Sequence, residues 1–358
     1  MTYTKNILPV SDLFKKYIDE ASKGKRVQKN GKLISPSTLK NYNALLTNLI
    51  EFDNIKGDIF QVNTNYRYSK RSFLQEKNRY KKFYKGFTDF LYNKGCTDNY
   101  VGMLIKTFRS FYIYLNTVKG YNTGEFYKNF YVRKEEIPII VLSREQLQFL
   151  IGNYLFESKL LPHLKVTKDI FVLGCTIGLR YSDLISLKGQ NIEQQSGNLY
   201  IVTKSKKTGT DTRIKLPDYC IAILKKYQKK QKLLLPTLSL NQFNKNLKTI
   251  AFEAGWTYDV GKERSKRGVR KEQKIDGKTY RFCDLLSSHV MRRTAITTLL
   301  ILGMPETLVR KISGHAANSK EFYKYVRYSE SFLDQETDKA FAKLNPFAQP
   351  QKSLLNIL

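Results

Sequence analysis

The fold of this chain is decided by four short stretches: TIGLRYSDL at residues 176–184, SHVMRRT at 288–294, ISGH at 312–315 and FYKYV at 322–326. In the first stretch, Arg180 follows a glycine at the expected start of a helix. In the second, His289 and Arg292 lie three residues apart, so they share one helix face. In the third, Gly314 is expected to end a helix, which turns His315 out of the helical pattern.

These residue types suit the cleavage of a phosphodiester bond. That reaction needs positive groups on the non-bridging oxygens, a nucleophile in line and an acid for the leaving oxygen, and most of its catalysis is positioning and electrostatics. Arginine donates two parallel hydrogen bonds to the oxygens, and histidine adds a donor that also moves protons near neutral pH. An arginine beside an acid is usually a structural salt bridge, and one tyrosine means little in a chain that has 24 of them. The specific signal is the order Arg, His-x-x-Arg, Gly-His, Tyr.

In this order the motifs resemble the catalytic domain of tyrosine recombinases, the phage integrase family, and most of all the integrases of Bacteroides-type mobile elements. The resemblance implies that Arg180 and Arg292 clamp the scissile phosphate. It also implies that His289 and His315 hydrogen-bond the phosphate oxygens and help proton transfer, and that Asp183 orients the site. It implies no metal and no cofactor. Arg293 and Ser313 depart from the usual family pattern, without removing a required chemical type.

The family uses a tyrosine shortly after the Gly-His motif as the nucleophile. Tyr325 lies 325 − 315 = 10 positions after His315 and Tyr323 lies 8 after it, whereas the family often shows about nine, so neither fits perfectly. Two residues apart on a helix, the two side chains point to nearly opposite faces. We favour Tyr325, because the ending Phe-x-Lys-Tyr-Val resembles related integrases. Tyr323 is the alternative and Tyr328 a distant third.

The family also places a lysine in the loop of a two-stranded hairpin, as the general acid for the 5′ oxygen. Residues 199–202 and 213–216 are expected to form two strands with a charged, glycine-containing loop between them. That loop offers Lys204, Lys206 and Lys207. We choose Lys207, because it begins a Lys-Thr-Gly sequence that is common at this place.

The charge of the chain indicates a polyanionic partner. The 358 residues contain 62 Lys and Arg against 31 Asp and Glu, a net charge of +31. Nucleic acid is the usual partner for such a charge, because each neutralised phosphate releases a counterion. A basic ribosome-like or membrane-surface protein is the alternative. Because the basic residues are spread along the whole chain, we expect a protein that wraps its partner.

No run of about 18 apolar residues and no signal peptide is found, so we expect a cytoplasmic protein without a membrane segment. The four cysteines are scattered without CxxC spacing, which favours reduced core residues over a disulfide frame or a zinc site.

The first third of the chain reads as four helices, and four helices joined by polar loops make a small bundle. The expected segments are 11–21, 35–52, 80–93 and 101–115. The bundle resembles the family's core-binding (SAM-like) domain. We predict a helical core-binding, DNA-binding domain at 1–137 and a mixed α+β catalytic domain with a C-terminal tail at 138–358, so that the chain is mainly α with a small β-sheet. Residues 1–53 are part of the bundle or in part an arm-site reader, and both interpretations stay open.

Two basic regions are candidate phosphate contacts. They are Lys81, Lys82 and Lys85 on the third helix, and Arg264, Lys266, Arg267 and Arg270 in a stretch from 255 to 283 that is expected to be an extended loop or hairpin on the DNA side. The alternatives are a solvated helix face and a disordered surface loop. The apolar end of the tail, 354–358, docks either on a neighbouring subunit or on its own core.

The leading function is therefore site-specific recombination. Attack by the tyrosine leaves a 3′-phosphotyrosine that stores the energy of the bond, so rejoining needs no ATP. We expect integration and excision of a mobile element on double-stranded DNA carrying specific recombination sites, by a homotetramer. A type IB topoisomerase-like enzyme and a non-catalytic DNA-binding protein are the alternatives. The DNA target sequence does not follow from these residues.

Overall fold

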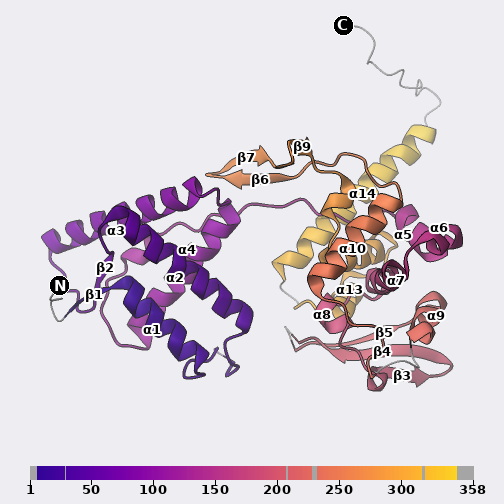
Figure 1. Cartoon of the computed structure of the whole chain (residues 1–358), viewed down its shortest axis with the longest axis horizontal. Helices are drawn as coiled ribbons and strands as arrows, with labels where there is room; N and C mark the ends of the chain where they lie inside the picture. The colour runs from indigo at the N-terminus through magenta and orange to yellow at the C-terminus, as the bar shows by residue number, and fades with distance from the viewer. Residues whose placement is uncertain (1–5, 29, 207–208, 228–231, 317–318, 345–358) are drawn as a thin grey trace, which may run out of the picture. The chain divides into compact units, whose positions relative to one another are not determined.

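The structure is a computed structural model and describes residues 6–28, 30–206, 209–227, 232–316 and 319–344. It divides into two compact units, which Figure 1 shows as a ribbon coloured along the chain. Unit 1 comprises Met1–Ile137 together with Lys262–Gln273, and unit 2 comprises Pro138–Gly261 together with Lys274–Leu358. The chain therefore passes three times from one unit to the other.

Unit 1 is a helical bundle with short strands at its edge. Its elements are β1 (Ile7–Pro9), α1 (Val10–Ser22), α2 (Pro36–Lys56), β2 (Gln61–Asn63), α3 (Lys70–Asn93), α4 (Asp98–Thr117), the 3₁₀ helix η1 (Phe126–Asn129), β6 (Glu263–Lys266) and β7 (Val269–Glu272). The four predicted helices are present. Ser35 caps α2 by accepting a hydrogen bond from the Thr38 N–H, with Pro36 in the first turn, as the Ser-Pro signal predicts.

The core of unit 1 is unusually aromatic. The rings of Phe83, Phe108 and Phe130 lie within contact of one another, with centroids 5.5–6.1 Å apart. Offset and edge-to-face ring pairs of this kind add to the free energy gained by burying apolar surface. The aromatic stripe of α3 therefore packs inward, as the core interpretation of that stripe predicts.

Unit 2 combines helices with a three-stranded antiparallel sheet of order β3-β4-β5. Its elements are α5 (Arg144–Gly152), α6 (Tyr154–Lys159), α7 (Pro162–Ile177), α8 (Tyr181–Leu184), the 3₁₀ helix η2 (Gly189–Asn191), β3 (Ile192–Gln195), β4 (Asn198–Lys204), β5 (Asp211–Lys215), α9 (Asp218–Tyr227), α10 (Leu240–Glu253), β8 (Lys274–Ile275), β9 (Lys278–Thr279), α11 (Phe282–Leu285), α12 (Ser288–Ile301), α13 (Glu306–Ser313) and α14 (Lys320–Leu344). The two predicted strands are β4 and β5, whereas β3 was not predicted. The predicted fold class, mainly α with a small β-sheet, is confirmed.

Close packing of α7 against α12 holds the centre of unit 2 together. A Cβ added at Gly174 of α7 would meet the sulfur of Met291 of α12 at 1.9 Å, so only glycine lets the two helices approach this closely. Helix α7 leads to Arg180 and helix α12 carries Arg292, so this contact fixes the spacing of the two arginines.

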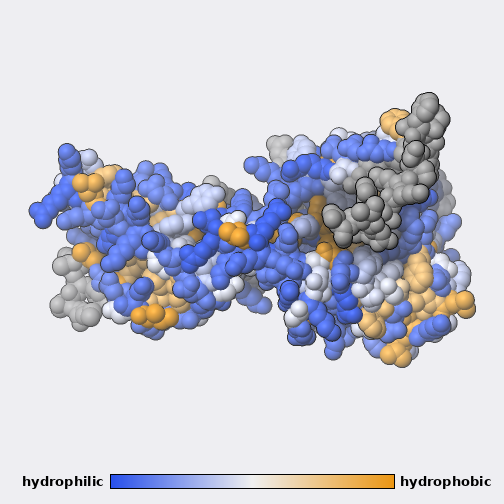
Figure 2. Space-filling view, turned by 90° about the horizontal axis from the view of Figure 1, so that it is seen from above, coloured by the Kyte–Doolittle hydropathy of each residue, from blue (hydrophilic) through white to orange (hydrophobic). Residues whose placement is uncertain are grey.

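The face of the molecule in Figure 2 is mostly hydrophilic, as expected for a chain of net charge +31. All four cysteines are free thiols, and Cys175, Cys220 and Cys283 are buried. Among the described residues, no helix combines the length and the apolar character needed to span a membrane.

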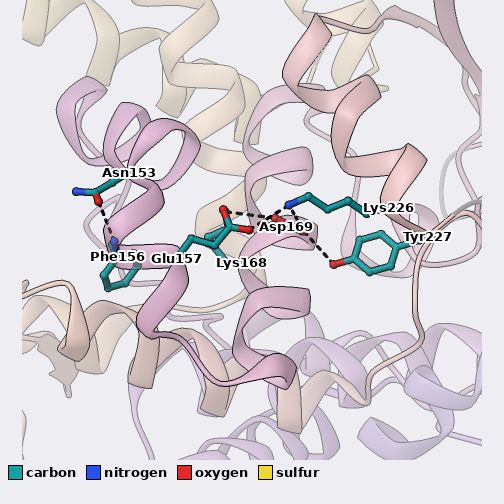
Figure 3. Close-up of polar contacts among 7 residues, drawn as sticks. All are labelled: Asn153, Phe156, Glu157, Lys168, Asp169, Lys226 and Tyr227. Carbon is teal, nitrogen blue, oxygen red and sulfur yellow. Dashed lines mark hydrogen bonds and ion pairs between the residues drawn. The ribbon is translucent and has the colours of Figure 1, made fainter.

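A buried ion network joins α6, α7 and α9 (Figure 3). Nζ of Lys168 lies 2.6 Å from Glu157 and 3.3 Å from Asp169, and Nζ of Lys226 lies 3.1 Å from each of the same two carboxylates. The hydroxyl of Tyr227 donates to Asp169 at 2.9 Å. The side chain of Lys168 is only 4% exposed and that of Lys226 is 45% exposed, although they share the same acids.

This pair of lysines gives a matched test of burial. Lys168→Met leaves the buried Asp169 and the partly buried Glu157 short of a cation, and we expect it to lower the free energy of unfolding by about 3–5 kcal/mol. Lys226→Met removes a solvated partner of the same acids and should cost less than about 1 kcal/mol. Urea unfolding of both variants measures the difference. Equal losses would contradict the assignment of the buried lysine as the essential cation.

Candidate active site

The first arginine is presented by a turn between α7 and α8. Gly178 ends α7 with φ 68°, and its N–H donates to the Gly174 carbonyl at 3.0 Å. Arg180 then occupies the N-cap of α8 in extended conformation, at φ −66° and ψ 147°. A residue with a Cβ is strained at a positive φ of this kind, so the glycine of the motif is needed to deliver the arginine.

The second arginine connects the end of α7 to the end of α13. Arg292 lies on α12 and is 7% exposed. Its Nη1 donates to the Gly178 carbonyl at 2.9 Å, and its Nη2 lies 3.2 Å from both ring nitrogens of His315. Arg292 therefore holds two of the predicted motifs together.

His315 leaves the helical pattern as the sequence predicts. Helix α13 ends at Ser313, and Gly314 follows with φ 60°. The N–H of His315 donates back to the Arg310 carbonyl at 3.0 Å, which closes the helix end. The hydroxyl of Ser313 lies 2.8 Å from Nδ1 of His315. A leucine, usual at position 313 in the family, has no group that could make this contact.

The cluster is partly buried and strongly electropositive, which lowers the pKa values of Arg292 and His315. Burial, followed by the charge of Arg180, lowers the pKa of Arg292 to about 10, although Tyr325 and Asp183 oppose the shift. Burial and the charges of Arg292, Arg180 and Arg310 lower the pKa of His315 to about 3. An anion bound between these groups would oppose the electrostatic part of both shifts, so the site favours an anion.

The lowered pKa of His315 predicts how the free energy of unfolding changes with pH. The pKa of His315 in the folded chain, about 3, lies below the usual histidine pKa of about 6.5, so between these pH values the unfolded chain binds a proton that the folded chain does not. Stability therefore falls as the pH falls from about 6.5 towards 3. On going from pH 7 to 4.5, we expect the wild type to lose about 2 kcal/mol more than His315→Gln. Urea unfolding at both pH values checks this, and parallel losses would contradict it.

Of the candidate tyrosines, Tyr325 lies at the cluster. The centroid of its ring is 6.1 Å from that of His315, and Tyr325 lies near enough to Arg292 to oppose the lowering of the Arg292 pKa. Tyr323 is 48% exposed, with the Arg310 guanidinium 4.6 Å from its ring centroid. Tyr328 lines a different cavity with Tyr258 and Phe332. The three side chains thus face three different surroundings.

The β4–β5 loop also reaches the cluster. Nη1 of Arg180 donates to the hydroxyl of Ser205 at 2.9 Å, and the N–H of Lys206 lies 3.4 Å from Oδ1 of Asp183. Ser205 is 5% exposed, and its Cβ would lie 3.9 Å from a Cβ built on Gly314. The sequence analysis missed Ser205, whose only signal was its place two residues before the chosen lysine.

The β4–β5 loop contains three candidate lysines. Lys207 lies outside the described residues. Of the other two loop lysines, Lys204 ends β4 with an exposed side chain, and Lys206 donates from Nζ to the Ser182 carbonyl at 3.3 Å. Asp183 is 3% exposed, lies on α8 and contacts the loop through its Oδ1. Its Oδ2 has no hydrogen-bond partner among the described residues.

The remaining predicted residues are found on α12, on α3 and in the β6–β7 hairpin. His289 is in the first turn of α12 with an exposed side chain, and its approach to the phosphate stays a prediction. Lys81, Lys82 and Lys85 are exposed on α3. Of the four hairpin cations predicted to contact DNA, Arg264 and Arg267 form ion pairs with Glu135 and Asp89. Arg270 lies 3.8 Å from Glu263, and Lys266 is partly exposed.

Comparison with known proteins agrees with this geometry. Residues 158–331 match the phage integrase family. This part of the chain is a phage integrase domain. It contains Arg180, Arg292, His315 and Tyr325, so the family resemblance drawn from the motifs is confirmed. None of the curated proteins compared with the chain matches it.

Solved structures share the fold at low sequence identity. A lambda integrase dimer bound to a COC′ core site matches with a TM-score of 0.58 and 12% identity, over 89% of this chain and 77% of that one. The Tn1549 transposon integrase in complex with transposon right end DNA also scores 0.58 at 12% identity, over 89% and 94%. XerH site-specific recombinase in its post-cleavage complex with palindromic difH substrate scores 0.55 at 16%, over 89% and 80%. At these identities, the matches establish the fold of the integrase domain and of the chain around it.

Proposed function

We propose that this chain is a site-specific tyrosine recombinase that cuts and rejoins double-stranded DNA through a 3′-phosphotyrosine. The observation that carries the proposal is the convergence of Arg180, Arg292 and His315 around one electropositive point, with the Tyr325 ring beside it. Solved relatives of the same fold are bound to recombination or transposon DNA, and the net charge of +31 suits such a partner.

The chemistry follows from the residue types. The guanidinium groups of Arg180 and Arg292 bind the non-bridging oxygens of the scissile phosphate and neutralise the charge that grows in the transition state. The Tyr325 oxygen attacks phosphorus, the bond to the 5′ oxygen breaks, and the leaving oxygen takes a proton from an acid. We assign that acid to Lys207 by resemblance. The phosphotyrosine keeps the bond energy, so a 5′-hydroxyl reverses the step without ATP.

His315 acts as a neutral hydrogen-bonding group in the free protein. With its pKa lowered to about 3 by burial and by the neighbouring arginines, the ring is uncharged at neutral pH. Arg292 can only donate and lies 3.2 Å from both ring nitrogens, so the nitrogen that carries no proton accepts from it. A phosphate that draws Arg292 away would free that nitrogen to bind or pass a proton. We assign His289 to the phosphate by resemblance alone.

The wider organisation belongs to the same proposal. We propose that residues 1–137 form the core-binding domain and that residues 138–358 form the catalytic domain. Lys81, Lys82 and Lys85 would contact phosphates from the exposed face of α3. Four copies would assemble on two paired sites, with integration and excision of a mobile element as the outcome.

The experiment is covalent trapping on a nicked duplex that loses its 5′-hydroxyl strand after cleavage. We expect a protein–DNA adduct that survives denaturation and EDTA, and that maps by mass spectrometry to the peptide containing Tyr325. A type IB topoisomerase-like enzyme would relax supercoils without joining two duplexes. A purely DNA-binding protein would bind the duplex and give no adduct, which would overturn the proposal.

A further inference from the structure

The β6–β7 hairpin comes from the sequence of unit 2 but packs as part of unit 1. Residues Lys262–Gln273 belong to the compact unit of the helical bundle, although the residues on both sides of them belong to unit 2. The two strands pair from Glu263 with Glu272 to Lys266 with Val269 and are drawn in orange in Figure 1. The contacts that hold this hairpin on the helices are polar.

Asp98, the first residue of α4, binds the turn of the hairpin. Its carboxylate accepts the backbone N–H of Arg267 at 3.0 Å and that of Gly268 at 2.8 Å, and it also accepts the hydroxyl of Tyr92 at 2.6 Å. Both turn residues have positive φ, 58° and 83°, which aims their successive N–H groups at the same carboxylate. Asp98 is 2% exposed, so its charge is desolvated and depends on these donors.

Glu135 binds the first strand in the same way. Its carboxylate accepts the backbone N–H of Ser265 at 2.5 Å and pairs with Arg264 at 3.3 Å. The side chain of Glu135 is 2% exposed. Its backbone is held by Asn99, whose amide donates to the Glu135 carbonyl at 3.2 Å and accepts the Glu135 N–H at 3.1 Å. Two buried carboxylates thus recognise the backbone of the hairpin.

The hairpin has little apolar surface with which to hold itself in place. All four residues of β7 are exposed, and the only large apolar side chain of the hairpin, Val269, is 59% exposed. Its attachment therefore depends mainly on Asp98 and Glu135. Arg267 adds an exposed ion pair with Asp89 at 2.6 Å, and its guanidinium lies 5.0 Å from the centroid of the Tyr92 ring. Such polar contacts fix which hairpin residues meet the helices. Because little apolar surface is buried, the hairpin can open locally without unfolding of the rest of the chain.

We propose that Asp98 and Glu135 are positioning residues that fasten the catalytic part of the chain to the helical unit at a second place, and that this attachment sets the lifetime of the protein–DNA complex. The inference rests on the proposed function, because it takes DNA as the ligand of both units. When two units bind one duplex, a second connection raises the effective concentration of each for the DNA once the other is bound. Loss of the attachment should therefore act on dissociation and leave the cleavage chemistry intact.

The first arm of the test uses no DNA. Limited trypsin digestion of the full chain reports on the hairpin at Lys266 and Arg267, with Lys274 and Lys278 in the neighbouring hairpin as internal reference sites. In Asp98→Asn and Glu135→Gln, we expect cleavage at the first pair to accelerate about tenfold, because opening governs proteolysis. Cleavage at the reference pair should not change. Glu125→Gln, an exposed acid of the same unit paired with Lys128, is the matched control.

The second arm measures dissociation from a labelled duplex together with single-turnover cleavage of the trapped complex. We expect both variants to dissociate about tenfold faster while the rate of adduct formation at saturating protein stays within about twofold. A hairpin that opens without a change in dissociation would overturn the proposal, and so would one that stays closed in both variants. Absence of any adduct in the wild type would instead count against the recombinase function, and the digestion and dissociation arms would still be decided.

A second pair of variants guards against misfolding, because it changes only exposed side chains. Asp89→Lys places a cation against Arg267. Like Asp98→Asn and Glu135→Gln, it should open the hairpin and shorten the lifetime of the protein–DNA complex. Adding Arg267→Asp restores an ion pair of reversed sign, and the double variant should recover at least half of both effects. If the double variant is as open as Asp89→Lys, or closed but still short-lived on DNA, the proposal fails.

Discussion

Replacing Tyr325 by phenylalanine is expected to abolish the covalent protein–DNA adduct while leaving the affinity for the duplex within about twofold, because only one oxygen atom is removed and the binding surface is unchanged. Of the three candidate tyrosines, Tyr325 is the one whose ring contacts His315, and a nucleophile must lie in line with the bond that breaks. The centroid of the Tyr325 ring lies 6.1 Å from that of His315, within reach of the arginines that would hold the phosphate.

Tyr323→Phe is the matched control, because it removes the same atom two residues earlier on α14. Its ring is 48% exposed and packs against Arg310, so we expect adduct formation within about threefold of the wild type. The measurement is denaturing electrophoresis of trapped complexes, with fluorescence anisotropy for binding. Loss of the adduct in Tyr323→Phe and its persistence in Tyr325→Phe would reverse the assignment.

The parts of the site that the sequence predicts are those fixed by local rules. Gly314 ends α13 with φ 60° because a glycine is favoured there, and this alone brings His315 out of the helix. The same rule places Arg180 after Gly178. The spacing of the tyrosines did not decide between Tyr325 and Tyr323. The ending Phe-x-Lys-Tyr-Val favoured Tyr325, and its ring does lie beside His315.

The parts that could not be predicted depend on contacts between distant segments. Ser205 reaches Arg180 only because the β4–β5 loop folds over α8. The stretch from 255 to 283 was predicted as a basic loop or hairpin on the DNA side, and it does form hairpins. Nothing local, however, signals that Asp98 and Glu135, more than a hundred residues away, bind its backbone. Arg264 and Arg267 form ion pairs with Glu135 and Asp89, and a count of charges in the sequence cannot reveal these pairs.

Replacing Arg292 by lysine should slow single-turnover cleavage by about 10²–10³-fold, because a preorganised donor to the transition state is lost while the charge remains. The guanidinium of Arg292 spans the Gly178 carbonyl on one side and His315 on the other. A lysine ammonium is a single point and cannot hold both contacts and present a planar fork to a phosphate. The loss should therefore appear in the rate of adduct formation at saturating protein, with binding weakened much less.

Arg293→Lys is the control on the next position of α12, where the side chain is only partly buried, and we expect its cleavage rate within about threefold of the wild type. Thermal unfolding of both variants separates a loss of chemistry from a loss of fold. If Arg292→Lys cleaves nearly as fast as the wild type, charge alone suffices at this position. The bidentate clamp would then have to rest on Arg180, whose Nη1 is already held by Ser205. A strong defect in Arg292→Lys with a folded protein places the fork itself in the transition state, where its planar geometry matches the two non-bridging oxygens.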